Sequence, residues 1–275
     1  SQNSMNRTGK ISYNFGWKYP ISSIHSLEVD FTAYSQNDDR KSKLNQTGTQ
    51  IERNDISLIY KNLNFEHLIR MSKYDRKYSQ KRPWNNFIDS RDRTKEDLIE
   101  YELKFNRKFS SSTLSSGIEI VYANYTSNRI KLGEQLINNI SFFSQLDAKH
   151  SSKISSSSGI RFDRYSEYEA VISPRIASMY KFNNHLKLRL SWGLGFRAPS
   201  FIERYIDWDH DQYGYMVMGN PDLKPETSNG STVSLQYDHS KNFTLSGIYY
   251  LTSFKNLIDS YSVSTGVLSL SLIHI

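Results

Sequence analysis

Residues 99–106 read Ile99-Glu100-Tyr101-Glu102-Leu103-Lys104-Phe105-Asn106, and this strict alternation of apolar and polar side chains decides the fold class. Because successive side chains of a β-strand point to opposite faces, the stretch has one apolar face and one polar face. The same period-two pattern recurs at residues 11–19, 27–33, 186–192 and 233–237. The sequence therefore predicts an all-β protein.

The length of these segments and of their connections favours a membrane barrel. The segments run to about ten residues or more, which suits a tilted strand that crosses a bilayer, whereas strands of globular sheets usually have about five or six. Tight turns are expected near residues 20–23, 61–64, 108–112, 149–152, 181–185 and 238–242. Longer polar stretches lie between them at 36–50, 75–95, 127–135 and 193–230, and only 165–170 is short for its place.

Short turns at one end and long loops at the other predict an antiparallel transmembrane β-barrel with periplasmic turns and extracellular loops. A soluble two-sheet sandwich also shows apolar and polar alternation, so it stays open as an alternative. We expect about twelve strands before Ile258 and a further strand at 261–272. The apolar faces should point outwards in a barrel and inwards in a sandwich.

Composition limits the function classes. The 275 residues include no cysteine, which excludes a disulfide scaffold and a thiolate metal site. No apolar run approaches the roughly 18 residues of a spanning helix. The formal charge of +7 comes from cations scattered among acids, which does not favour nucleic acid as a partner. The densest basic stretch, 76–95, is interpreted as a solvated loop or as a site for anions such as lipid phosphates.

The ends of the chain predict a fragment. The first residues, Ser1 to Asn6, show no basic region followed by an apolar core, so an exported protein would lack its start here. A closed barrel must also pair its first and last strands, and the abrupt end at Ile275 leaves that pairing unmade.

Two boxes between the strands at 186–192 and 233–237 carry the most specific signal. The first comprises Phe196, Arg197, Ala198, Pro199 and Ser200, continued by Glu203 and Tyr205. The second comprises Asn220, Pro221, Asp222, Leu223, Lys224, Pro225 and Glu226. Both resemble the paired boxes of the TonB-dependent receptor family residue for residue, and a weaker resemblance extends over 140–259.

The resemblance implies an outer-membrane barrel of about 22 strands in a Gram-negative bacterium, filled by an amino-terminal plug. Residues 1–275 would then be a partial barrel of about 12 to 13 strands, with the plug and the carboxyl-terminal strands absent. It further implies active uptake of a ferric siderophore, haem or cobalamin, powered by the TonB complex through the plug, with outer-membrane lipid around the wall. Neither a resident metal or cofactor nor an enzymatic activity is implied.

The box residues also make sense physically. Ser200 and Glu203 have the spacing of a capping box, so a helical turn can begin there, and Pro199 ends the preceding strand because it lacks an N–H. Glu226 can pair with Lys224 or Arg197. The boxes therefore shape a loop, and whether they also touch a ligand is left open.

His210 is the candidate ligand-binding residue, because haem receptors of the family resemble this chain in placing a histidine between the boxes, where a neutral imidazole can ligate iron. Tyr205, Tyr213 and Tyr215 could stack on or hydrogen-bond a chelate. A solvated histidine and aromatic packing are the simpler readings.

Two other function classes compete with a receptor. A passive porin would share every strand feature but not the boxes, and a soluble carbohydrate-binding sandwich would turn its apolar faces inwards. A barrel hydrolase is not favoured, because the chain has no Gly-x-Ser-x-Gly motif.

Overall fold

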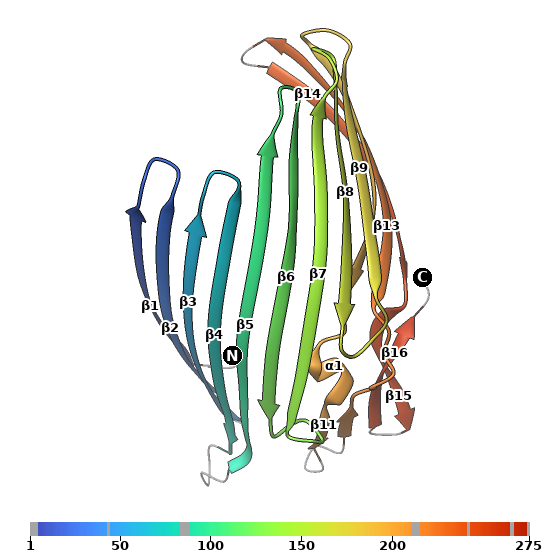
Figure 1. The fold of residues 1–275 in the computed structure, drawn as a ribbon. Helices are drawn as coiled ribbons and strands as arrows, with labels where there is room; N and C mark the ends of the chain where they lie inside the picture. The colour runs from blue at the N-terminus through green and yellow to red at the C-terminus, as the bar shows by residue number, and fades with distance from the viewer. Residues whose placement is uncertain are drawn as a thin grey trace.

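Most of the chain forms one curved antiparallel sheet of 12 strands (Figure 1). The computed structural model describes residues 5–42, 45–82, 88–210, 215–240, 243–264 and 267–273. The strands of the large sheet are β1 (Met5–Pro20), β2 (Ser26–Lys41), β3 (Gln46–Lys61), β4 (Phe65–Lys81), β5 (Ile88–Lys108), β6 (Ser112–Ser127), β7 (Glu134–Lys149), β8 (Ile154–Tyr165), β9 (Val171–Lys181), β10 (Leu186–Arg197), β13 (Glu226–Ser240) and β14 (Phe243–Lys255). The all-β prediction is confirmed.

The sheet is a meander, in which each strand pairs with its neighbours in sequence except where β10 pairs with β13. The register between β2 and β3 runs without a shift from Ser26 opposite Lys61 to Lys41 opposite Gln46. Strands β1 and β14 are the edges, and no pairing joins them among the described residues. The structure is therefore a partial barrel wall, and its 12 strands match the number expected before Ile258, to which two short strands between β10 and β13 are added.

The connections follow the predicted alternation, with one correction. Five predicted tight turns lie at 21–25, 62–64, 109–111, 150–153 and 182–185, at the top of Figure 1, and residues 241–242 of the sixth lie outside the described residues. At the other end, the stretches 36–50 and 75–95 are mostly strand, because β2 to β5 continue well past their apolar segments. Beyond a bilayer both faces of a strand meet water, so the backbone ladder continues although the apolar alternation has stopped.

The burial of apolar and polar side chains on the two faces of the sheet is the reverse of that in a soluble protein. Large apolar side chains are exposed, such as Tyr13 at 68% and Ile120 at 46%, whereas Ser141 and Asp163 are fully buried. Tyr101 and Leu103 are only half-buried, and no second sheet covers their face in the described structure. The apolar faces therefore point outwards, and the sandwich alternative is wrong.

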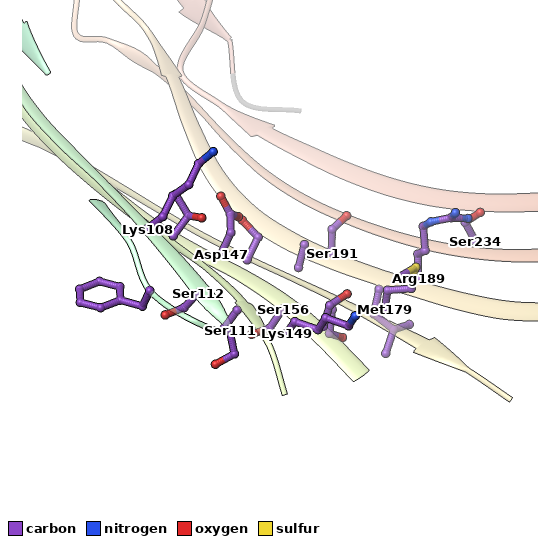
Figure 2. Close-up of a pocket in the computed structure, with 18 of the residues that line it drawn as sticks. Lys108, Ser111, Ser112, Asp147, Lys149, Ser156, Met179, Arg189, Ser191 and Ser234 are labelled. Carbon is purple, nitrogen blue, oxygen red and sulfur yellow. The ribbon is translucent and has the colours of Figure 1, made fainter. Parts of the chain in front are cut away.

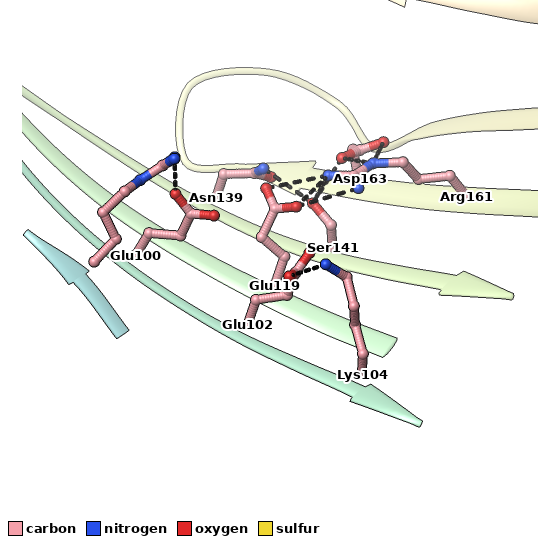
Figure 3. Close-up of polar contacts among 9 residues, drawn as sticks. Glu100, Glu102, Lys104, Glu119, Asn139, Ser141, Arg161 and Asp163 are labelled. Atoms are coloured by element: carbon pink, nitrogen blue, oxygen red, sulfur yellow. Dashed lines mark hydrogen bonds and ion pairs between the residues drawn. The ribbon is translucent and has the colours of Figure 1, made fainter. Parts of the chain in front are cut away.

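The polar face carries a network that ties neighbouring strands together (Figure 3). The Ser141 hydroxyl donates to Asp163 Oδ1 at 2.6 Å, and Arg161 Nε donates to the same carboxylate oxygen at 2.9 Å. Arg161 also pairs with Glu119 at 3.3 Å, so one guanidinium joins β6 and β8 across β7. Paired charges therefore satisfy the buried Asp163 carboxylate.

A smaller sheet of four strands lies at the end opposite the tight turns. It contains β11 (Asp207–His210), β12 (Tyr215–Met218), β16 (Val267–Ile273) and β15 (Leu257–Ser264), in that order. The prediction of one strand over 261–272 is wrong, since β15 and β16 pair as an antiparallel hairpin. The sequence between them contains Gly266, a residue that favours turns and interrupts a strand pattern. Among the described residues, no helix has the length and hydropathy needed to cross a membrane.

Candidate functional site

The segment between β10 and β13, residues 198–225, folds back over the polar face at the long-connection end of the wall. It begins with the short helix α1 (Phe201–Tyr205), whose Phe201 ring stacks on Tyr125 of β6 with centroids 4.8 Å apart. Tyr125 has the strand parity of Glu119, which places it on the polar face. A small apolar core forms here, made of Ala123, Tyr125, Ile130, Ile206 and Leu223. This packing fixes the segment on the wall.

The first box starts the helix as predicted. The Glu203 N–H donates to Ser200 Oγ at 3.3 Å, and the Ser200 N–H donates to Glu203 Oε2 at 2.7 Å, which completes a capping box. Strand β10 ends at Arg197, two residues before Pro199. Local sequence chemistry therefore positions α1.

Arg197 joins the two boxes. Its Nη1 lies 2.9 Å from Glu203 Oε2, and its Nε lies 2.6 Å from Glu226 Oε2. A second N–H reaches each carboxylate, so the planar guanidinium holds both in bidentate fashion. We call Arg197, Glu203 and Glu226 the Arg197 clasp. Of the two partners predicted for Glu226, Arg197 is the one in contact.

The electrostatics of the clasp favour its charged form. Hydrogen bonds from Arg197 are the main reason that the pKa of Glu226 is below its usual value. Burial opposes ionisation of Glu203, but the hydrogen bonds from Arg197 and Ser200 outweigh it, so that the pKa of this carboxyl is also lowered. The two carboxylates in turn raise the pKa of Arg197.

Arg204 makes a second link, which the sequence did not reveal. Its buried guanidinium donates to the carbonyl of Pro221 at 2.7 Å and pairs with Glu167 of the β8–β9 connection at 3.1 Å. The Tyr205 hydroxyl donates to the same Glu167 carboxylate at 2.7 Å. Burial and this hydrogen bond raise the pKa of Tyr205 to about 12. Tyr205 is thus engaged in packing the segment.

Gly219 lets the second box lie directly against α1. Its N–H donates to the Ile206 carbonyl at 2.6 Å, and the next residue, Asn220, donates to the Glu203 carbonyl at 3.1 Å. A Cβ atom at Gly219 would lie 2.6 Å from the backbone carbon and oxygen of Arg204. Only glycine allows this approach.

The hairpin of β11 and β12 extends from this base. Trp208 lies against the Arg129 guanidinium, which sits 4.0 Å from the ring centroid and pairs with Asp92. The backbones of His210 and Tyr215 are directly opposite at the end of the hairpin. The structure does not describe the side chains of these two residues, and Tyr213 lies outside the described residues. These ligand-binding candidates therefore stay predictions.

The remaining box residues shape the loop. Phe196 meets the Tyr165 ring edge-on at 6.2 Å, Pro199 is buried between β10 and α1, and Leu223 is 3% exposed. The Asn220 side chain accepts the Asp222 N–H at 2.9 Å, which makes a local turn. In the described part of the chain, no group of three or more His, Cys, Asp or Glu side chains is arranged to hold a metal ion.

A separate hollow of about 740 Å³ lies at the short-turn end of the wall (Figure 2). Its lining combines small side chains such as Ser156 and Ser191 with the charged Asp147 and Arg189. The sequence did not single out this region. It is remote from both boxes, which lie at the other end of the strands.

Comparison with known proteins identifies related chains. Residues 1–271 match the family model described as TonB dependent receptor-like, beta-barrel. The chain is similar to the iron-regulated outer membrane virulence protein of Vibrio cholerae serotype O1, with 33% identity over 100 residues, covering 36% of this chain and 15% of that protein. It is also similar to the heme/hemopexin utilization protein C of Haemophilus influenzae, with 26% identity over 155 residues, covering 49% of this chain and 21% of that protein.

Solved structures show the same fold. The chain superposes on the hemophore receptor HasR of Serratia marcescens, solved in complex with its hemophore HasA and heme, with a TM-score of 0.76 and 13% identity. It superposes on the siderophore receptor PirA of Pseudomonas aeruginosa with a TM-score of 0.65 and 12% identity. The match covers 97% of this chain and 50% of HasR, and 96% of this chain and 57% of PirA. The chain thus spans about half the length of these receptors.

Proposed function

The chain belongs to the TonB-dependent receptor family, and from this we propose that it forms barrel wall in a receptor that imports an iron chelate. The wall lies in the outer membrane of a Gram-negative bacterium. The observation that carries the proposal is the Arg197 clasp, because it joins both boxes and supports a hairpin with a candidate ligand-binding histidine. In this proposal the long connections face the cell exterior, where the chelate arrives.

Haem is the proposed cargo. The Haemophilus influenzae relative has a name that refers to heme, and HasR was solved with heme. His210 would ligate the haem iron through a neutral imidazole, and Tyr213 and Tyr215 would contact the porphyrin. Tyr205, by contrast, would support the hairpin through Glu167. Cobalamin has no comparable support.

Coupled transport would require parts beyond this wall. We propose that residues 1–275 form one partial barrel domain, and that a plug elsewhere in the whole protein engages the TonB complex. The hollow at the short-turn end is lined largely by small side chains, which would leave room for such a plug. A passive porin would need neither the plug nor the clasp.

The test is a spectral titration of the whole receptor with haem. His210→Ala should weaken haem binding at least tenfold and shift the Soret band, because an axial ligand is lost. His239→Ala is the matched control and should leave haem binding unchanged, because His239 lies at the end of β13 that is far from the second box. Unchanged affinity and spectrum in His210→Ala would rule out this ligand.

A ferric siderophore is the second candidate, supported by the structural similarity to PirA. The test is uptake of iron-loaded siderophores by cells that express the receptor, with and without an intact TonB complex. Uptake that depends on TonB would favour the siderophore over haem. Uptake that persists without TonB would favour the passive porin.

A further inference from the structure

The outward face of β4 and β5 changes from apolar to basic along the strands. On β4 the outward side chains from Phe65 to Met71 are mostly apolar, and those beyond begin with Lys73. On β5 the outward residues beyond Ile99 are Asp97, Lys95, Arg93 and Arg91. The basic stretch 76–95, interpreted from sequence as a loop or an anion site, therefore lies largely on strands that continue above the apolar band. Because side chains alternate between the two faces of a strand, the cations at the outward positions of this stretch face away from the barrel interior.

A groove of about 660 Å³ lies in this region. Lys77, Arg91 and Arg93 line it, together with Gln50 and Ser79. All five have the strand parity of the outward apolar residues, so their side chains face the surroundings of the barrel. The groove is therefore positioned at the outer surface, not in the lumen.

The cations of the groove are only partly neutralised. Lys77 and Arg93 are directly opposite each other on β4 and β5, an arrangement of like charges that costs stability. Arg93 pairs with Asp75 through Nε at 3.0 Å. Within the described ranges, no carboxylate lies at ion-pair distance from Lys77 or Arg91. An anion seated between these side chains would relieve the repulsion.

The backbone under the groove is held in place. Asn128, in the β6–β7 connection, accepts the Arg93 N–H at 3.0 Å and donates to the Arg91 carbonyl at 2.8 Å. Two acidic residues also line the groove: Asp39, which has the outward strand parity, and Asp92, which has the parity of the polar face and pairs there with Arg129. The backbone positions of both arginines are thus fixed before any ligand binds, which lowers part of the cost of binding.

We propose that this groove binds the phosphorylated sugar headgroup of an outer-leaflet glycolipid. Phosphate oxygens match the donors of Arg91, Arg93 and Lys77. Lys77 lies six residues beyond Met71, or about 14 Å above the apolar band for a strand tilted by about 45°. That height suits a headgroup, not an acyl chain. The inference rests on the proposed orientation, with the long connections outside.

The experiment uses the whole receptor in phosphatidylcholine vesicles with and without phosphorylated lipopolysaccharide. Lys77→Gln/Arg91→Gln removes the two cations that have no carboxylate partner, and we expect lipopolysaccharide binding to weaken about tenfold, the loss of one or two charge-assisted hydrogen bonds. Lys77→Arg/Arg91→Lys keeps both charges and should retain binding. Lys10→Gln/Lys131→Gln removes two exposed cations elsewhere and should have no effect.

Each outcome decides the inference. Equal binding by all three double variants, or by dephosphorylated lipopolysaccharide, would overturn it. Inorganic phosphate that competes at similar concentration would assign the groove to free anions and overturn the lipid source. If Lys77→Gln/Arg91→Gln does not fold, the inference is still tested by comparing how the unmodified receptor binds phosphorylated and dephosphorylated lipopolysaccharide.

Orientation is measured separately, without haem or TonB. Lys131→Cys places a thiol at an exposed position of the β6–β7 connection, outside the groove, in a chain that has no cysteine. A membrane-impermeant maleimide should label it on intact cells. Failure to label would contradict the orientation in the proposed function, whereas loss of lipopolysaccharide specificity would contradict only the present inference.

Discussion

The wall and the segment 198–225 are stabilised in different ways. In the wall, backbone ladders join neighbouring strands and the outward side chains need only be apolar. In the segment, a few specific contacts made by Arg197, Arg204 and Gly219 hold α1 against the second box. We therefore expect the wall to tolerate substitutions that preserve the alternation of apolar and polar side chains. In the segment, by contrast, the loss or addition of a single contact should lower stability.

The largest expected effect is at Arg204. Replacing Arg204 with Met removes the donor of the Pro221 carbonyl and the cation beside Glu167, which keeps only the hydrogen bond from Tyr205. The local stability of the segment should fall by about 3 kcal/mol, near the low end for breaking a buried pair because Glu167 can reach water. Hydrogen exchange of the Ile206 and Asn220 amides should then accelerate about 100-fold. Arg164→Met, on the exposed end of β8, is the control; equal acceleration there would contradict the prediction.

The next effect tests the wall by comparing its two faces. Ile120→Lys places an ammonium on the outward face near the middle of β6 and should cost about 2 kcal/mol of unfolding free energy in lipid. Val121→Lys puts the same charge on the polar face and should cost little. Urea titration of the two refolded variants in lipid vesicles measures their unfolding free energies. A larger loss for Val121→Lys would reverse the assignment of the faces.

A single methyl group should matter at Gly219. Gly219→Ala places a Cβ atom 2.6 Å from the Arg204 backbone and should cost about 1 to 2 kcal/mol of local stability through overpacking. Limited proteolysis between α1 and β13 should be faster. Gly247→Ala, in β14, meets nothing within 4 Å and should leave proteolysis unchanged.

The smallest effect is the pH response of the Arg197 clasp. The pKa values of Glu203 and Glu226 are lowered on folding, so their contribution is present above the usual value of 4.5 and is lost as the pH falls through the lowered values. Because the groups are partly exposed, the loss should not exceed about 1 kcal/mol. Hydrogen exchange of α1 between pH 6 and pH 3 should show it, and Arg197→Gln should flatten the profile.

The wall could be predicted from sequence because alternation is a local signal. The strands of 27–33 and 99–106, and five of the six predicted tight turns, are found where the pattern placed them. Where β2 to β5 leave the apolar band, the pattern ends but the ladder does not, and the sequence therefore predicted loops. The hairpin of β15 and β16 was missed because its alternating, serine-rich sequence resembles that of one continuous strand.

The candidate site was predictable only in part. Ser200 and Glu203 act at a fixed short spacing, which makes the capping box visible in the sequence. The pairing of Arg204 with Glu167 joins residues far apart in the chain and leaves no periodic trace. Charge alone could not show that Arg91 and Lys77 share an outward face, because that depends on the register of β4 and β5.

The order of the strands has a consequence for assembly. Since nearly every pairing joins neighbours in sequence, each hairpin can dock on the preceding one at a small cost in loop-closure entropy. The exception is the pairing of β10 with β13, which must wait until 198–225 has folded back. Arg197 stands opposite Glu226 at the first rung of that pairing, so its ion pair holds the two strands in register as the ladder starts. We expect this step to limit the rate at which the wall grows.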